Sequence, residues 1–160
     1  TGNYYLDGSA AFALGTGDFT IEGFIRPSSV SLDMSLFDFR PYGTNGAYPL
    51  LYLSSAGQIV YYVSGVVAIS GSHGLLTTEF SHYALVRQSG VSKIFVKGVQ
   101  IGSNYTDTNN YSISAARPVF GVSTFNMTSA FFSGYADQQR ITKAARYSST
   151  FTLPTSYPNP

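Results

Sequence analysis

Two loops carry the side chains that protein sites use to bind sugars. Recognition of a pyranose needs an aromatic face for its apolar side and amide or hydroxyl groups for its hydroxyls. Tyr42, Asn45 and Tyr48 offer these groups in the first loop. The second loop offers a larger set, made up of Asn104, Tyr105, Asp107, Asn109 and Tyr111. We therefore predict that these eight residues bind a glycan, against the alternative that a tyrosine-rich β protein simply carries tyrosines on its loops.

A third segment is suited to contact with protein. Residues 124–127 read Thr-Phe-Asn-Met, which would expose an apolar pair, Phe125 and Met127. Exposed apolar pairs of this kind occur where a partner protein docks. We predict a protein contact at these two residues.

The sequence offers little support for a catalytic site. Glycoside hydrolysis needs two carboxyl groups about 5 to 9.5 Å apart, and Asp18 and Glu22 are four residues apart on one expected strand. Glu22 is better explained by pairing with a basic neighbour or by capping a loop. No nucleophile motif precedes His73, expected in an exposed loop, or His82, expected to be structural. We predict that the chain is not an enzyme and has no catalytic residue.

Metal sites are also not indicated. The chain has no cysteine, so thiolate sites and disulfides are excluded. Calcium needs several converging oxygen ligands, and the Asn-rich residues 104–110 contain one carboxylate, Asp107. Asp33 and Asp38 flank an apolar stretch and do not improve the case. We predict no cofactor and no metal ligand, while a weak Ca²⁺ site completed by carbonyl groups stays open.

The composition limits the partners. Charged residues make up 11% of the 160 residues and the net charge is +1, so no basic stripe is present to meet nucleic acid. No apolar run approaches the roughly 20 residues of a membrane helix, so no membrane insertion is expected. The start at Thr1, with neither Met nor a signal-like segment, indicates a processed chain or part of a longer one.

Repeated period-two alternation predicts the elements that position these loops. In residues 19–26, Phe19, Ile21 and Ile25 would face one side and Thr20, Glu22 and Arg26 the other. Hairpins are expected where residues 50–53 return as 58–63 and where residues 83–87 return as 93–96 and then 99–101. The turn residue Gly57 can supply the positive φ that a short connection needs.

Further strands complete the expected architecture. We predict them at residues 4–6, 11–14, 36–39, 66–69, 118–122 and 131–141, with a helical turn only at residues 142–147 and an extended tail from Pro154. About a dozen short strands at regular spacing indicate a sandwich or barrel. No linker is apparent, so residues 1–160 are predicted to form a single all-β domain.

Several sequence segments resemble those of laminin-G-type jelly rolls of the concanavalin A-like lectin/glucanase superfamily. They are residues 15–22 (GTGDFTIE), 82–87 (HYALVR) with 94–99 (IFVKGV), and 134–142 (GYADQQRIT). The ending at residues 145–154 is similar to that of such domains in bacterial and bacteriophage surface proteins. The resemblance implies a two-sheet antiparallel jelly-roll sandwich, with ligands held at a concave face or in rim loops.

The chain departs from the family at two informative places. It has no Trp, although family members often show two aromatic residues that include Trp where Gly23 and Phe24 stand, and a Trp-His pair where residues 80–82 stand. Gln138 and Gln139 stand where an acidic residue commonly follows the Asp, which counts against calcium binding at that segment. The absence of a disulfide favours a microbial or viral origin over a secreted animal domain.

These observations lead to one functional expectation and one rival. We expect a lectin-like adhesion module on a virion or other extracellular surface, which binds glycans weakly and is displayed as a homo-oligomer. The rival is a structural virion decoration or fibre domain that contacts other surface subunits without recognising sugar. A large buried contact patch that involves Phe125, Met127 or the tail at residues 147–160 would favour the rival, and open aromatic loops at the rim would favour binding.

Overall fold

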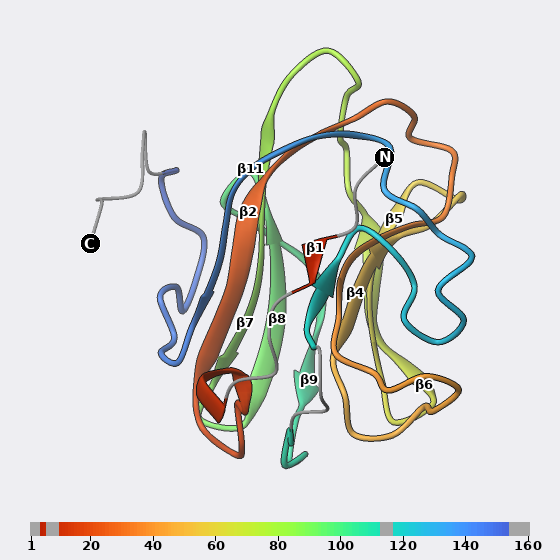
Figure 1. The fold of residues 1–160 in the computed structure, drawn as a ribbon. Helices are drawn as coiled ribbons and strands as arrows, with labels where there is room; N and C mark the ends of the chain where they lie inside the picture. Colours follow the sequence, from red (N-terminus) through yellow and green to blue (C-terminus); the bar gives the residue numbers. More distant parts are fainter. Residues whose placement is uncertain (1–3, 6–9, 113–116, 154–160) are drawn as a thin grey trace.

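The computed structural model describes residues 4–5, 10–112 and 117–153, which form two facing antiparallel sheets (Figure 1). One sheet has the strand order β1 (Tyr4–Tyr5), β10 (Val119–Phe120), β3 (Met34–Asp38), β4 (Leu50–Leu53), β5 (Gln58–Val63), β6 (Val66–Ser72). The other has the order β11 (Gly134–Thr142), β2 (Phe19–Pro27), β7 (Ser81–Gln88), β8 (Val91–Val96), β9 (Val99–Thr106). The predicted two-sheet all-β sandwich is confirmed.

The alternation predicted for the first long strand has the expected result. Phe19, Ile21 and Ile25 of β2 are fully buried between the sheets. Burying side chains of this size contributes about 1.5 to 3 kcal/mol each. The opposite face of β2 is also covered, because Thr20 and Glu22 are buried as well.

Both predicted hairpins are present. β4 pairs with β5 through Leu51 opposite Tyr61, and β7 pairs with β8 through Leu85 opposite Ile94. Gly57 lies in the first turn with φ of 73°, as the short connection requires. The registers place alternate residues of each strand in one core.

Two expected elements differ in the structure. Residues 11–14 were expected to be a strand, but Ala10–Phe12 form a 3₁₀ turn, η1, because this alanine-rich stretch has no period-two pattern to bury. Residues 142–147 contain no helical turn, since β11 continues to Thr142 and the chain then runs on irregularly. The tail expected from Pro154 lies outside the described residues. No described helix has the length and hydropathy of a membrane span.

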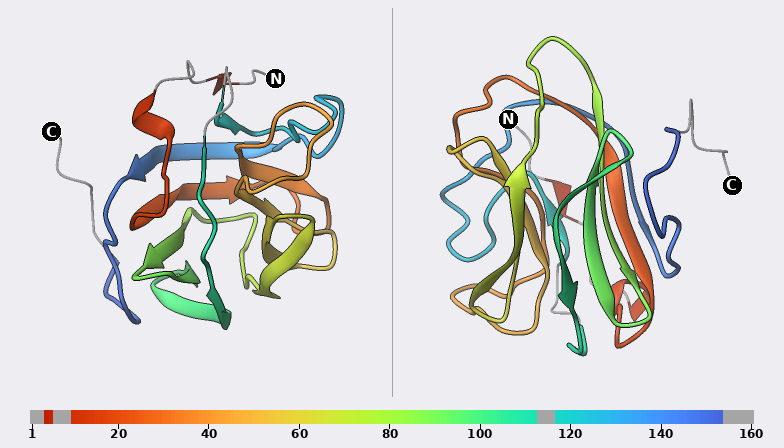
Figure 2. Two further views of the ribbon diagram at one scale, coloured as in Figure 1. Left: turned by 90° about the horizontal axis from the view of Figure 1, so that it is seen from below. Right: turned by 180° about the vertical axis from the view of Figure 1, so that it is seen from behind.

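The two sheets meet along β6 and β9. A Cβ atom on Gly102, whose φ is 69°, would lie 2.7 Å from the carbonyl oxygen of Ser70, so only glycine permits this approach. The views in Figure 2 show these strands closing one side of the sandwich.

A C-terminal strap, residues 143–153, crosses the outer face of the five-stranded sheet (Figure 1). Its Ala145, Tyr147 and Phe151 pack on Ala84, Val86 and Phe95 of β7 and β8 in a second apolar cluster. The rings of Tyr147 and Phe151 stack with centroids 3.6 Å apart. The strap explains why β2 is buried on both faces.

The outer face of the six-stranded sheet has its own partial cover. Residues 121–133 run beside β3, where the Ser35 N–H donates to the Ala130 carbonyl oxygen at 2.9 Å. This segment and the loop after β3 are joined where the Gly43 N–H donates to the Phe125 carbonyl oxygen. The uncovered remainder of this face contains the candidate site.

Candidate functional site

A hollow of about 240 Å³ lies on the outer face of the six-stranded sheet. Its floor and walls come from β3, β4 and β5 and from the covering segment, with the lining residues Asp33, Ser35, Arg40, Leu50, Tyr52, Tyr62, Ser123, Ser129 and Ala130. Leu51, Leu53, Tyr61 and Val63 are in the core. The pleat therefore turns Tyr52 and Tyr62, which alternate with them, outward.

Arg40 is the fixed centre of one wall. Its Nε donates to Asp38 Oδ1 at 3.0 Å and its Nη2 to Asp38 Oδ2 at 2.7 Å, an ion pair in which both side chains are buried. Nη1 donates to Asn45 Oδ1 at 2.8 Å and Nη2 also reaches Ser123 Oγ at 3.2 Å. The guanidinium group lies 5.8 Å from the Tyr62 ring centroid. These contacts make this wall rigid.

The opposite end of the hollow is acidic and aromatic. The exposed Asp33 accepts a 2.7 Å hydrogen bond from the Ser55 N–H at Oδ1. Partial burial raises the pKa of the Tyr52 hydroxyl, and the nearby negative charge of Asp33 raises that pKa further. Tyr52 thus stays protonated at neutral pH and can donate a hydrogen bond, while its ring offers an apolar face.

The first predicted loop borders this hollow. Asn45 is exposed and reaches it through the bond to Arg40. Tyr42, two residues beyond Arg40, is 71% exposed. Tyr48 is half-buried and packs against the core. The structure therefore leaves Tyr42 and Asn45 accessible to a ligand, whereas Tyr48 mainly supports the loop.

The second predicted loop divides into surface and core residues. Asn104 is exposed on β9, and Tyr105 is half-buried with its ring edge against Tyr61. Asp107 and Tyr111, by contrast, are buried at 0% and 1% exposure. The Asp107 carboxylate therefore lies inside the sandwich rather than on a solvent-exposed loop.

Asp107 is buried because it has enough hydrogen-bond donors. Ser92 and Tyr61 donate to its Oδ2 at 2.7 and 3.2 Å, and Tyr111 donates to its Oδ1 at 2.6 Å. Arg87 Nη1 lies 3.9 Å from Oδ1. Burial raises the pKa values of both tyrosines, and the Asp107 charge adds to that effect. This network holds the end of β9 in place and is inaccessible to a glycan.

The structure brings the two predicted loops to one rim through the β5–β6 turn. The Ser64 N–H donates to the Gly46 carbonyl oxygen at 3.0 Å, and Ser64 Oγ donates to Asn109 Oδ1 at 3.1 Å. Figure 1 shows both loops at the lower end of the sandwich. Asn109 is half-buried. Residues far apart in sequence are therefore neighbours here, as binding by both loops would require.

The predicted protein-contact pair also lies by the hollow. Phe125 is 37% exposed and its ring centroid lies 5.5 Å from the Arg40 guanidinium carbon. Met127 is half-buried in the turn that its N–H closes onto the Ser123 carbonyl oxygen. One face of Phe125 is thus occupied by an intramolecular contact.

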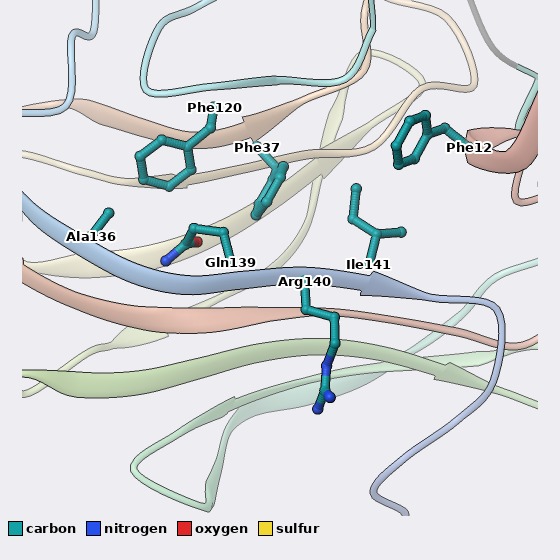
Figure 3. Close-up of a pocket in the computed structure, with 7 residues that line it drawn as sticks. All are labelled: Phe12, Phe37, Phe120, Ala136, Gln139, Arg140 and Ile141. Carbon is teal, nitrogen blue, oxygen red and sulfur yellow. The ribbon is translucent and has the colours of Figure 1, made fainter. Parts of the chain in front are cut away.

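A larger cavity, of about 470 Å³, lies between β11 and the β3 and β10 edge of the other sheet. Its described walls are mainly apolar, with Phe12, Phe37, Phe120 and Ile141 (Figure 3). The Gln139 amide is engaged by the Phe24 carbonyl and the Tyr83 hydroxyl. Arg140 points away from the rings, toward Glu22. This cavity suits an apolar group better than a sugar.

The acidic and histidine residues that were weighed as catalytic candidates make structural contacts instead. Asp18 accepts the Ser89 N–H at 2.8 Å. Glu22 is buried against His82, Arg140 and other donors, so its expected pairing with basic neighbours is confirmed. His73 is buried rather than exposed as expected, and its Nδ1 accepts the Leu75 N–H. No three His, Asp or Glu of the described residues form a group able to hold a metal ion.

The sequence interpretation missed the residues that form the hollow itself. Tyr52 and Tyr62 belong to the predicted hairpin and alternate with the buried leucines and Tyr61. That alternation alone could have placed both rings on the outer face. Nothing local, however, predicts that residues 123–130 fold beside them and complete the walls.

Solved structures with the same fold are found among sialic-acid enzymes and their modules. The CBM40 module of a Ruminococcus gnavus IT-sialidase, bound to α2,3-sialyllactose, superposes with a TM-score of 0.66 at 15% identity, over 92% of both chains. The NanB sialidase of Streptococcus pneumoniae (TM-score 0.67, 13% identity) and a leech intramolecular trans-sialidase (0.67, 14%) match 92% of this chain. The chain spans about a quarter, 26%, of each of these two enzymes.

Sequence comparison adds the family. No curated protein sequence gives a significant match. The profile of the concanavalin A-like lectin/glucanases superfamily, in its laminin G form, matches residues 1–150, which is nearly the whole chain. Together with the two facing antiparallel sheets, this match shows that the chain belongs to the concanavalin A-like lectin/glucanases superfamily.

Proposed function

We propose that this chain is a non-catalytic carbohydrate-binding module whose principal site is the hollow between Asp33, Arg40, Tyr52 and Tyr62. The observation that carries the proposal is the pairing of two outward tyrosine rings with fixed polar groups in one hollow of the sheet. Tyrosine rings pack on the apolar face of a pyranose, and the carboxylate and hydroxyl groups satisfy its hydroxyls. The bound CBM40 module of similar fold supports this role.

The predicted loops extend the site. Asn45 stands beside the hollow and Tyr42 is exposed in the same loop, and Ser64 of the β5–β6 turn joins Asn109 to that loop. Asn104 and Tyr105 lie on β9, which leads to Asn109. We propose that a longer glycan contacts these residues after its terminal sugar enters the hollow. Binding in this form needs no metal, because every group named is a protein side chain. A chelator should therefore leave binding unchanged.

Tyr62→Ala is the direct test. We expect loss of the ring to weaken glycan binding by about tenfold or more, equivalent to about 1.4 kcal/mol. The purified domain would be displayed multivalently on a glycan array, with and without chelator. The matched control is Tyr135→Ala, which removes an exposed ring stacked on Arg26 of the other sheet.

Each result has a defined meaning. Equal binding by Tyr62→Ala and the wild type would remove the hollow from the proposal. No binding to any glycan by the folded wild-type domain would contradict a carbohydrate-binding role altogether. That result would favour the rival role, in which Phe125 and Met127 contact other surface subunits. Size-exclusion chromatography with candidate partner subunits would then be the next measurement.

We also propose a surface setting for the module. Low charge and an aromatic-rich composition suit display on a virion or an extracellular surface, in several copies. A shallow hollow of this size gives low affinity per site, so display in several copies would be needed for firm attachment.

A further inference from the structure

The charges around the hollow discriminate between classes of sugar. The charged residues among its described lining are Asp33 and Arg40, and Asp38 lies directly behind Arg40. The buried Arg117 donates from its Nε to the Arg40 carbonyl oxygen, so Asp38 and both guanidinium groups lie beneath the surface, and Asp33 is the exposed charge of the described lining. This matters because many surface glycans end in an acidic sugar.

Arg40 is poorly placed to serve as the cation for such a sugar. Its charge is paired with the buried Asp38, its nitrogens also donate to Asn45 and Ser123, and the residue is only 7% exposed. Asp38 is fully buried and also accepts the Thr124 N–H at 2.9 Å. A ligand carboxylate that competed with Asp38 for Arg40 would weaken the pairing of a buried charge, which is strongly unfavourable.

Asp33 adds repulsion at the open end. Its carboxylate is exposed, and the Ser55 N–H fixes it through Oδ1. A carboxylate only accepts hydrogen bonds, so it attracts hydroxyl donors and repels another carboxylate. Like charges placed together in this way exclude a wrong partner at a binding surface.

From this charge arrangement we infer that the hollow selects neutral hexose residues and rejects glycans that end in a carboxylate-bearing sugar. A neutral hexose donates hydroxyl hydrogens to Asp33 and packs against Tyr52 and Tyr62. The inference rests on the proposed function and narrows its ligand class. It separates this chain from the similarly folded module bound to sialyllactose.

The test compares glycans that differ only in the acidic cap. An array would carry oligosaccharides ending in galactose, glucose, mannose or N-acetylglucosamine, together with the sialylated counterparts of the galactosides. We expect the affinity for each capped glycan to be lower than that for its uncapped parent by about tenfold or more. Asp33→Asn should narrow this gap, because the amide keeps the oxygen that accepts the Ser55 N–H but loses the charge.

A matched variant and two contrary outcomes complete the design. Asp137→Asn removes an exposed carboxylate on β11 of the other sheet and should leave the ratio unchanged. Capped glycans that bind as well as or better than their parents would overturn the neutral-sugar inference while the binding function stands. Absence of binding to both classes by the folded domain would overturn the binding function and the inference with it.

Discussion

At the scale of single residues, His73 is the titratable group whose environment has the clearest consequence. It follows β6, is 5% exposed, and its Nδ1 accepts the Leu75 N–H at 2.9 Å. No described group pairs with its buried Nε2. Burial lowers the pKa of this imidazole, so it is neutral in the folded protein.

This lowered pKa predicts acid sensitivity. The unfolded chain binds a proton at His73 near pH 6.5, whereas the folded chain does so only at lower pH. The stability that His73 contributes is therefore complete above about pH 6.5 and is lost as the pH falls below it. We expect His73→Asn, which can still accept the Leu75 N–H, to lose less stability than the wild type between pH 7.5 and pH 5. Urea unfolding at both pH values measures the difference.

The second histidine provides the internal comparison for that experiment. His82 is bonded to Glu22 at 3.1 Å and is present in both proteins, so its contribution cancels in the difference. Equal losses of stability in the wild type and His73→Asn would contradict the prediction.

At the scale of elements, the strap and β2 are held together by one carboxylate. Glu22 Oε1 accepts from Arg140 Nη2 at 2.7 Å and from Arg146 Nε at 2.8 Å. Its Oε2 accepts the Tyr147 hydroxyl at 2.8 Å and lies 3.1 Å from His82 Nε2. Arg146 and Tyr147 belong to the strap, so this network fastens residues 143–153 to the sheet.

Glu22→Gln should therefore loosen the strap and destabilise the fold. The amide keeps one accepting oxygen but loses the shared negative charge, so the ion pairs with Arg140 and Arg146 become weaker hydrogen bonds, although both side chains are partly exposed and can be hydrated. We expect a loss of about 2 to 3 kcal/mol in the free energy of unfolding, below the range for a fully buried pair. Urea denaturation gives this value, and faster hydrogen exchange at the Phe151 amide would locate the change.

A surface ion pair supplies the control for the strap prediction. Glu79 pairs with Lys97 at 2.6 Å, and both side chains are exposed. Glu79→Gln should cost under about 1 kcal/mol. If the two variants are destabilised equally, the strap is held by its aromatic contacts and Glu22 is unimportant to it.

At the scale of the whole molecule, the site is shallow and open, so the number of copies decides the strength of attachment. A hollow of about 240 Å³ accommodates little more than one sugar. Linking several sites makes later binding events intramolecular and raises the apparent affinity by about 10² to 10⁴. We expect a streptavidin-tetramerised domain to bind a glycan-coated surface at least about a hundredfold more tightly than the monomer.

Biolayer interferometry with monomer and tetramer on the same surface measures this gain. A tetramer of Tyr62→Ala should lose most of it, because avidity multiplies only the binding that each site provides. A tetramer no tighter than the monomer would argue against the proposed mode of attachment.

The alternation of residue types by itself determined the architecture. A two-sheet sandwich could be predicted from the apolar side of β2, formed by Phe19, Ile21 and Ile25, and from the two hairpins with their glycine turns. The order of the segments that resemble the family then predicted that the sandwich is a jelly roll. Period two is a local property, because the pleat turns successive side chains to opposite faces whatever the rest of the chain does.

Only the tertiary structure decided which polar residues are available. Asp107 and Asn45 look alike in sequence, as polar residues in tyrosine-rich loops, yet Asp107 is buried by donors from Tyr61 and Ser92 while Asn45 remains exposed. The hollow likewise depends on residues 121–133 running beside β3, and the burial of Glu22 depends on the strap. A strand's pattern specifies which side chains share a face, but contacts between segments distant in sequence decide whether that face meets solvent.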